Sequence, residues 1–358
     1  MRALLAGGGT AGHVNPLLAT AAELVRRDPE VRLAALGTSA GLEARLVPEA
    51  GLDLVTIPRA RIPRQVSTEW CGLPGSLVAA VRGARWAIDR VGADVVVGFG
   101  GYVAAPAYLA ARRRGVPVVV HEANSRPGLA NRLGAWRAAR VAVAFSRTPL
   151  RGAHLTGLPL RPAIADLDRA RARQGAADAL GLDPARRVLV VTGGSLGAQR
   201  LNQTVLAVAP SLLAAGVQVL HLTGAGKAGE ARGAIVHPDY HVREYLDQMD
   251  LAYAVADLVI ARAGAGSVSE IAAVGVASVL VPLPIGNGEQ GLNARDLVEA
   301  GGAIAVADGD FTPQWAADRL PPLFCAPDTL ATMSARASAV GIRDGAARLA
   351  DLIEEVAR

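Results

Sequence analysis

The chain has 358 residues, which is enough for two domains of ordinary size. Its hydrophobic content of 51% is too high for a disordered chain. Aromatic residues make up only 4%, which leaves few stacking platforms and predicts no nucleic-acid partner. The formal net charge of +5 suits an anionic ligand or an anionic lipid surface.

Cys71 and Cys325 are the only cysteines, and their separation matches no metal or redox spacing. We therefore expect a reducing, cytosolic compartment and no disulfide framework. The first residues run into glycines too soon for a signal peptide, and no apolar run reaches the roughly 18 residues of a membrane span.

The first predicted strand covers residues 2–6, and a glycine turn at residues 7–13 leads to a helix over residues 16–26. The turn matches the G-x-G-x-x-G dinucleotide fingerprint. The second strand, residues 31–36, ends without the acid that would hold a ribose, which disfavours an NAD-linked oxidoreductase. His13 follows the turn and either caps its own helix or acts as a general base.

A third strand at residues 53–57 leads into a segment, residues 59–86, in which arginines alternate with apolar residues such as Trp70, Leu77 and Trp86. An amphipathic, arginine-bearing helix of this kind can rest on an anionic membrane surface. A core helix with a solvated basic edge explains the same pattern, so both interpretations stay open.

Two further strands, residues 94–97 and 116–120, end in a second glycine turn and in a polar loop that begins His121-Glu122-Ala123-Asn124. Open α/β sheets bind ligands at such carboxyl ends of strands. His121 and Glu122 form a catalytic pair or brace the loop, and bracing is favoured. A strand at residues 141–145 closes the series, and residues 156–162 are predicted to be a linker.

The pattern then starts again with a strand at residues 187–192, a glycine turn at residues 193–198 and a helix from about residue 200. Further strands are predicted at residues 217–222, 234–237, 257–260, 277–281 and 303–306, followed by two C-terminal helices.

The loop at residues 261–270 carries the clearest ligand signal of this half. Gly264 and Gly266 allow a backbone to approach a ligand, and Ser267 is predicted to cap a helix N-terminus, which favours a phosphate. Glu270, expected in the first helical turn, would repel a phosphate and therefore bind neutral hydroxyls such as those of a sugar. An ordinary capped helix is the alternative.

Alternating βα units predict an α/β protein with two Rossmann-like parallel-sheet domains that face each other across a cleft. We expect an N-terminal domain at residues 1–160 and a C-terminal domain at residues 161–340, with a last helix, about residues 341–358, packed back on the first domain.

With these turns, the chain resembles the MurG family of membrane-associated glycosyltransferases over essentially its whole length. The resemblance rests on six motifs in matching order: residues 8–13, 98–103, 121–124, 193–198 and 262–270, and Glu289-Gln290 before Asn293. It implies the GT-B fold and transfer of N-acetylglucosamine from UDP-N-acetylglucosamine to lipid I, which is undecaprenyl-diphosphate-N-acetylmuramyl-pentapeptide. The product would be lipid II of peptidoglycan synthesis.

The resemblance also implies site residues, position by position. Contacts with UDP-N-acetylglucosamine would come from Thr10, Ala11, Gly12, Asn124, Arg161, Ser195, Leu246, Ala265, Gly266, Ser267, Val268, Ser269, Glu270 and Gln290. The acceptor diphosphate would lie near Gly9, Gly12, Gly100, Gly101 and Tyr102.

For catalysis, His13 is the predicted general base and Glu122 its competitor. No Asp-x-Asp cluster stands at a strand end, so no metal and no cofactor are expected. Two departures from the family pattern are Ala11, whose methyl fits only at negative φ, and Glu289, whose charge would face an anionic donor.

The expected partners are the two substrates, an anionic membrane surface and other cell-wall synthesis proteins, with the chain peripheral on the cytoplasmic face of the cell membrane. Two alternatives remain: a UDP-sugar transferase acting on another lipid or a small aglycone, and a non-catalytic nucleotide-sugar-binding protein. The paired glycine turns favour a diphosphate acceptor over a neutral one.

Overall fold

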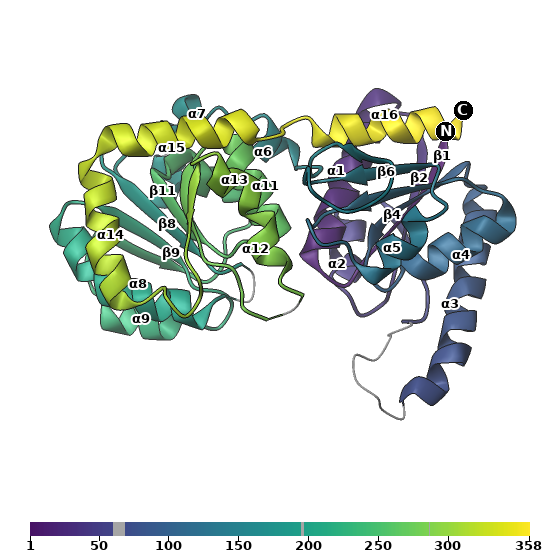
Figure 1. Cartoon of the computed structure of the whole chain (residues 1–358), viewed down its shortest axis with the longest axis horizontal. Helices are drawn as coiled ribbons and strands as arrows, with labels where there is room; N and C mark the ends of the chain where they lie inside the picture. The colour runs from purple at the N-terminus through teal and green to yellow at the C-terminus, as the bar shows by residue number, and fades with distance from the viewer. Residues whose placement is uncertain (60–68, 195–196, 286) are drawn as a thin grey trace. The chain divides into compact units, whose positions relative to one another are not determined.

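The computed structural model describes residues 1–59, 69–194, 197–285 and 287–358, without the side chains of residues 69–74 and 327. The chain divides into two compact units (Figure 1). Unit 1 comprises Met1–Arg161 together with Asp344–Arg358, and unit 2 comprises Pro162–Arg343.

Unit 1 is built on a seven-stranded sheet in the order β3-β2-β1-β4-β5-β6-β7, in which all neighbours are parallel. Helices cover both faces, so its central strands are near-continuous apolar runs. The strands are β1 Arg2–Gly7, β2 Arg32–Gly37, β3 Asp53–Thr56, β4 Val95–Gly100, β5 Val118–Glu122, β6 Arg140–Val143 and β7 Ala153–Leu155. The helices are α1 Ala11–Arg27, α2 Glu43–Glu49, α3 Glu69–Val91, α4 Ala104–Arg114, α5 Leu129–Ala135 and α16 Gly345–Ala357.

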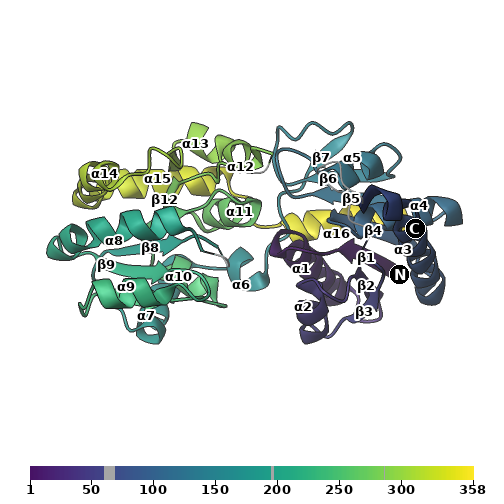
Figure 2. The same ribbon diagram turned by 90° about the horizontal axis from the view of Figure 1, so that it is seen from below.

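Helix α16 returns to unit 1 from the far end of the chain and lies beside α1 (Figure 2). Leu349, Ala350 and Ile353 are fully buried in one core cluster with Leu17 and Leu24 of α1. This apolar stripe therefore makes the last helix part of the first core.

Unit 2 repeats the design with a six-stranded parallel sheet in the order β10-β9-β8-β11-β12-β13. Its strands are β8 Val188–Thr192, β9 Gln218–Leu222, β10 Tyr240–Arg243, β11 Leu258–Ala261, β12 Ala277–Leu280 and β13 Ala303–Ala305. Its helices are α6 Pro162–Ala165, α7 Arg169–Leu180, α8 Gln199–Ala214, α9 Ala228–Ala234, α10 Met249–Val255, α11 Ala265–Val274, α12 Glu289–Asn293, α13 Arg295–Glu299, α14 Pro313–Cys325 and α15 Pro327–Val340.

The prediction of two Rossmann-like parallel-sheet domains is confirmed, with three local corrections. The strand predicted at 234–237 is wrong, because α9 ends at Ala234 and the strand begins only at Tyr240. A short strand, β7, extends the first sheet beyond the segment expected to close it. Three helices rather than two follow β13, because Ala326 ends α14 and Pro327 starts a new one.

Both sheets reverse their order at one point, between β1 and β4 in unit 1 and between β8 and β11 in unit 2. Ligands of open α/β sheets bind outside the carboxyl ends of the strands at this switch point. Four of the predicted motifs, at residues 8–13, 98–103, 193–198 and 262–270, lie at the carboxyl ends of these four strands.

No helix in the described part of the chain is both long and apolar enough to cross a membrane.

Candidate functional site

The first glycine turn runs directly into α1, which begins at Ala11 instead of the expected residue 16. Thr10 is the N-cap in an extended conformation, so His13 lies in the first helical turn. No described residue other than glycine has a positive φ, so the methyl group of Ala11 fits without strain.

His13 is held in one tautomer. Its Nδ1 lies 3.2 Å from the carbonyl oxygen of Gly8 and 3.1 Å from the hydroxyl of Thr10. A carbonyl only accepts, so Nδ1 carries the proton and Nε2 keeps its lone pair. Burial lowers the pKa of His13, and the charges of Glu122 and Glu43 offset this only in part. The ring is therefore neutral at neutral pH, as a general base must be.

The second glycine turn packs against the first. Gly100 has φ +100°, and a Cβ there would stand 3.0 Å from both Cδ2 and Nε2 of His13. Gly101 has φ +78°, and a Cβ there would overlap the carbonyl oxygen of Gly8. These glycines thus allow two loops to meet around His13. The next residue, Tyr102, stacks under the Arg59 guanidinium at 4.5 Å.

Glu122 is the last residue of β5, and four donors occupy its carboxylate. One oxygen accepts from the backbone and side-chain nitrogens of Asn124, at 2.9 and 3.4 Å. The other accepts from Gly128 N and from Nδ2 of Asn131, both at 3.0 Å. This pattern fits the bracing interpretation.

His121 also has a structural role, because it holds the segment after β7. Burial lowers its pKa to about 4, and its Nε2 lies 3.1 Å from the carbonyl oxygen of Gly157, to which it donates. The buried imidazole is neutral and fixed inside the sheet, so it joins β5 to the segment after β7.

Glu43, at the start of α2, is a site residue that the sequence analysis missed. Its side chain is fully buried where the turn after β1 meets the end of β2. Glu43 and Tyr102 help line a small hollow of about 80 Å³ there. The second strand itself ends without an acid, and Glu43 follows its last residue by six positions, on the next helix. Gly37 and Gly41, which leave space for it, were the available signal.

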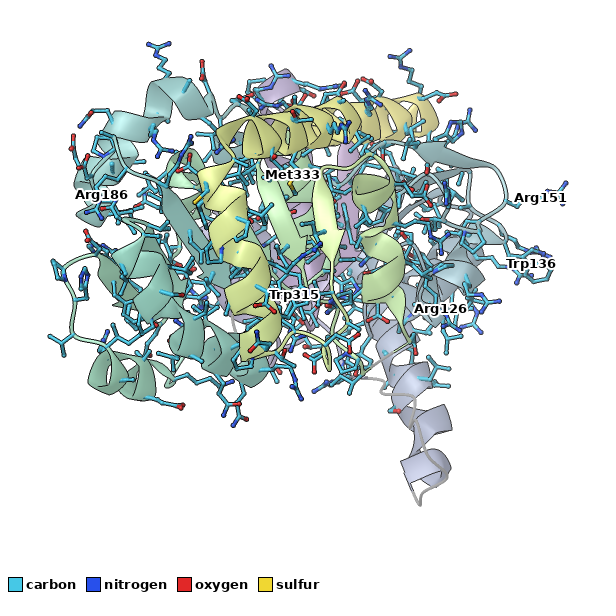
Figure 3. The ribbon with its side chains drawn as sticks, turned by 60° about the vertical axis from the view of Figure 1, so that its left-hand side comes forward. Arg126, Trp136, Arg151, Arg186, Trp315 and Met333 are labelled. Carbon is cyan, nitrogen blue, oxygen red and sulfur yellow. The ribbon has the colours of Figure 1, made fainter. Side chains whose placement is uncertain are left out.

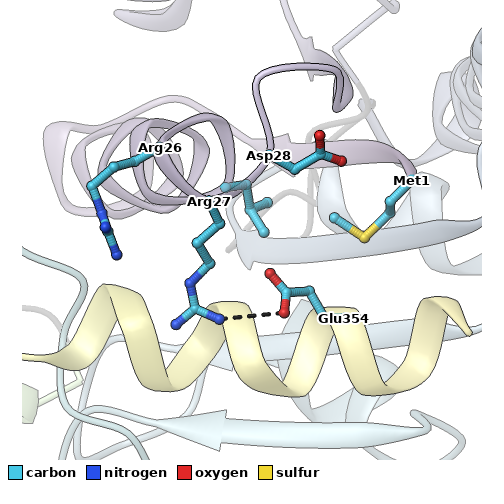
Figure 4. Close-up of a pocket in the computed structure, with 6 residues that line it drawn as sticks. Met1, Arg26, Arg27, Asp28 and Glu354 are labelled. Carbon is cyan, nitrogen blue, oxygen red and sulfur yellow. Dashed lines mark hydrogen bonds and ion pairs between the residues drawn. The ribbon is translucent and has the colours of Figure 1, made fainter.

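A larger hollow of about 560 Å³ lies beside Met1, at the amino end of β1 (Figure 4). Arg27 crosses it to bind Glu354 of α16 at 3.4 Å, and also pairs with Asp351 at 2.7 Å. This is the edge of the sheet opposite to the ligand-binding edge, and its charges pair with one another, so we assign it no chemistry.

In unit 2, the turn after β8 is closely packed. A Cβ at Gly193 would overlap the backbone of Ala198, and one at Gly197 would overlap the carbonyl oxygen of Thr223. Ser195, predicted to contact the donor, lies outside the described residues.

The loop after β11 opens into a helix earlier than predicted. Gly264 is the N-cap of α11, so the prediction of Ser267 as the cap is wrong. Val268 N already donates to the carbonyl of Gly264, at 3.0 Å. The N–H groups of Ala265, Gly266 and Ser267 therefore precede the first intrahelical bond. Cβ atoms built at Gly264 and Gly266 meet open space, which leaves this helix end accessible to an anion.

Glu270 lies in the second turn of α11, and not in the first as expected. Its Oε2 accepts a hydrogen bond of 2.9 Å from the hydroxyl of Tyr253. The sequence offered no signal for Tyr253, since α10 and α11 meet only in the fold.

Arg262 turns away from the opening of the loop. Its guanidinium pairs with Asp308 at 2.6 Å and donates to the carbonyl oxygen of Val281 at 3.1 Å. Since these partners follow β13 and β12, Arg262 ties the carboxyl ends of three strands together beneath the loop.

Other residues predicted to contact UDP-N-acetylglucosamine, Arg161, Leu246 and Gln290, are partly exposed. Gln290 accepts from Leu283 N at 2.9 Å through its side-chain oxygen. Glu289 accepts from Asn287 N at 2.9 Å. Leu246 lies in the loop before α10, and Arg161 is the last residue of the first part of unit 1.

Within the described residues, no group of three or more His, Cys, Asp or Glu side chains gathers as a metal site.

Comparison with known sequences shows that the chain contains both domains of one glycosyltransferase family. Residues 3–143 match the glycosyltransferase family 28 N-terminal domain, and residues 188–349 match the family 28 C-terminal domain. A Nocardioides protein named UDP-N-acetylglucosamine--N-acetylmuramyl-(pentapeptide) pyrophosphoryl-undecaprenol N-acetylglucosamine transferase is 55% identical over 99% of this chain and 98% of its own length. A Streptomyces avermitilis protein of the same name is 50% identical over 99% and 98%.

Among solved structures, the crystal structure of Acinetobacter baumannii MurG matches with a TM-score of 0.79 and 27% identity, over 99% of both chains. A UDP-GlcNAc 2-epimerase from Neisseria meningitidis, bound to UDP-GlcNAc, shares the fold with a TM-score of 0.69 at 15% identity, over 99% of both chains.

Proposed function

Since the chain belongs to the MurG family of glycosyltransferases, we propose that it transfers N-acetylglucosamine from UDP-N-acetylglucosamine to the muramyl sugar of lipid I, producing lipid II. The observation that carries the proposal is the state of His13. Its imidazole is neutral, lies at the switch point of unit 1 and leaves Nε2 free of a proton. A sugar hydroxyl that attacks a donor must lose its proton to such a group.

The donor half of the proposal rests on α11. Its open N-terminus suits the diphosphate of UDP, because the N–H groups and the helix dipole stabilise an anion there. Glu270, held by Tyr253, suits the neutral ribose hydroxyls. The other proposed donor contacts are Thr10, Ala11, Gly12, Asn124, Arg161, Ser195, Leu246, Val268, Ser269 and Gln290.

In the proposed reaction, the C4 hydroxyl of the muramyl sugar attacks the anomeric carbon of the donor and inverts it. His13 Nε2 takes the hydroxyl proton as the new glycosidic bond forms and the bond to UDP breaks. Negative charge grows on the departing diphosphate, where the α11 N–H groups and Arg161 stabilise it by preorganised electrostatics. Glu122 is the weaker candidate for the base, since four donors already fix its carboxylate.

The direct test is release of UDP from UDP-N-acetylglucosamine in the presence of a lipid I analogue. His13→Ala should lower kcat by ~10²–10⁴-fold, the usual contribution of a general base. His154→Ala, at an exposed histidine of β7, is the matched control and should leave kcat unchanged. Near-normal turnover by His13→Ala would remove this residue from the base role.

The acceptor is tested separately. Glycines Gly9, Gly12, Gly100 and Gly101, with Tyr102, are the proposed surroundings of the acceptor diphosphate. UDP release with a diacylglycerol or a small aglycone, and none with the lipid I analogue, would instead identify a UDP-sugar transferase of different acceptor class. Binding of UDP-N-acetylglucosamine without release on any acceptor would identify a sugar-nucleotide-binding protein.

The remaining part of the proposal is a surface that binds the membrane. Helix α5 supports it better than α3, which holds Trp70, Leu77 and Trp86 of the sequence-based prediction. Leu129, Leu133 and Trp136 are 71%, 47% and 74% exposed on or just after α5. Arg126, Trp136 and Arg151 project outward from the same part of unit 1 (Figure 3). Exposed apolar side chains flanked by arginines suit an anionic lipid surface.

On α3, the evidence for a membrane face is weaker. Leu77 packs against the core of unit 1, whereas Trp86 is 54% exposed. The side chain of Trp70 lies outside the described ones.

Sedimentation with anionic and neutral vesicles separates these faces. A triple variant with Gln at Leu129, Leu133 and Trp136 should lose binding to anionic vesicles while keeping turnover on a short-chain acceptor. Val236→Gln, at a 95% exposed apolar residue of unit 2, is the control and should bind like the wild type. Unchanged binding of the triple variant together with a loss in Trp86→Gln would move the surface to α3.

A further inference from the structure

We propose that Glu43 is a positioning residue for His13 and acts through the single peptide group that joins Gly8 to Gly9. The inference rests on the proposed role of His13 as the general base. It adds a residue that lies on α2 and touches neither the ring of His13 nor any predicted substrate contact except Gly9.

The geometry places one peptide group between two side chains. Its N–H, at Gly9, donates to Oε2 of Glu43 at 2.8 Å. Its C=O, at Gly8, accepts from Nδ1 of His13 at 3.2 Å. The two bonds form a continuous chain from carboxylate to imidazole, because hydrogen bonds at the two ends of a peptide polarise each other.

Three glycines, Gly8, Gly37 and Gly41, surround the side chain of Glu43 and form what we call its cradle. A Cβ at Gly8 would stand 2.5 Å from Oε1 of Glu43, and one at Gly37 would stand 2.5 Å from its Cγ. A Cβ at Gly41 would overlap Oε2. Three glycines from three different segments therefore leave the space that this one side chain fills.

Glu43 is also charged. Burial raises its pKa, but hydrogen bonds from Gly9 N, from the Thr38 hydroxyl at 2.7 Å and from Thr38 N at 3.0 Å outweigh burial, so the pKa lies below its usual value. A buried carboxylate with three donors is ionised at neutral pH.

The charge has a specific consequence for His13. When Nε2 takes a proton, the ring becomes an imidazolium whose positive charge faces the Gly8 carbonyl. A negative charge behind that carbonyl strengthens it as an acceptor and stabilises the imidazolium, as a carboxylate does directly in a Ser-His-Asp triad. Here the peptide group stands between the two.

The groups that face His13 come from four segments. Glu43 lies on α2 and Glu122 on β5, and both charges favour protonated His13. Thr10 contacts Nδ1 from the preceding turn, and Gly100 of β4 contacts the other side of the ring. Because Glu122 stays in place, removal of the Glu43 charge isolates one contribution.

The test compares Glu43→Gln with two controls. Glu43→Gln should lower kcat about tenfold, leave the KM for UDP-N-acetylglucosamine unchanged and move the acid limb of the pH–rate profile to lower pH. Thr38→Val removes one of the hydrogen bonds to Glu43 but keeps the carboxylate, so it controls for loosened structure, and its acid limb should shift less than that of Glu43→Gln. Glu43→Asp keeps the charge and should restore the acid limb even if its turnover is reduced.

A double-mutant cycle decides whether the effect runs through His13. In the His13→Ala background, Glu43→Gln should cost less than twofold in kcat. An equal tenfold cost in both backgrounds, or the same pH profile in Glu43→Gln as in wild type, would overturn the inference while leaving the base role intact. Near-normal turnover of His13→Ala alone would instead overturn the base role, and this inference with it.

Discussion

Gly100→Ala is predicted to slow the reaction by moving the ring of His13. Gly100 has φ +100°, where a side chain is strained at a cost of ~1–3 kcal/mol. The added methyl would also stand 3.0 Å from Cδ2 and Nε2 of His13, closer than ordinary van der Waals contact. The ring must therefore shift by a few tenths of an ångström. A misplacement of about 1 Å can cost 10²-fold, so a shift of this size should cost about 3–10-fold.

We accordingly expect kcat to fall about 3–10-fold in Gly100→Ala with the KM for UDP-N-acetylglucosamine unchanged, as measured by UDP release. Gly115→Ala is the matched control, since Gly115 also has positive φ, +69°, but a Cβ there meets nothing within 4 Å. It should lower the melting temperature and leave kcat within twofold. Equal losses of kcat in the two variants, or normal kcat in Gly100→Ala, would refute the claim that Gly100 sets the position of His13.

Three further predictions concern other residues of the two units. Tyr253→Phe removes one hydrogen bond to Glu270, worth ~0.5–1.5 kcal/mol, so the KM for UDP-N-acetylglucosamine should rise about 3–10-fold with little change in kcat; an unchanged KM would separate Glu270 from donor binding. Gly266→Ala places a methyl in the open space at the start of α11, so the KM for the donor should rise while the melting temperature holds or increases; an unchanged KM would place the diphosphate elsewhere. Burial lowers the pKa of both His121 and His221 from 6.5 to about 4, so the unfolded chain binds protons before the folded chain does as the pH falls below 6.5. Each of these two histidines should therefore lower the free energy of unfolding by about 2 kcal/mol at pH 5. A melting temperature that is the same at pH 7.5 and pH 5 would contradict this.

The fold could be predicted from the sequence because its strands are short apolar runs, each followed by a glycine turn. Elements without that signature were the ones misplaced. β10 begins at Tyr240 and alternates polar with apolar residues at the edge of its sheet, so the more apolar segment before it was preferred. The start of α1 was placed too late because glycine at residue 12 suggested a turn, although a first helical turn tolerates glycine once the packing around it is fixed.

The site was only partly predictable, for a physical reason. Motifs at strand ends identified His13 and the loop before α11, since the chain itself brings those residues to the sheet edge. Glu43 and Tyr253 reach the same regions from neighbouring helices, and their contacts exist only when separate segments meet. Sequence spacing within one segment carries no record of such partners.

The glycines show how one sequence signal can have two causes. At Gly8, Gly100 and Gly101 a Cβ would collide with Glu43, His13 or the neighbouring turn, so these residues make space for the protein's own groups. At Gly264 and Gly266 a Cβ would meet nothing. Open space alone does not mark a ligand site, since a Cβ at Gly175 or Gly229 would also meet nothing, but at the start of α11 it leaves three free N–H groups accessible. The first set therefore shapes the surroundings of His13, the proposed general base, and the second set lies where we propose that the sugar donor binds.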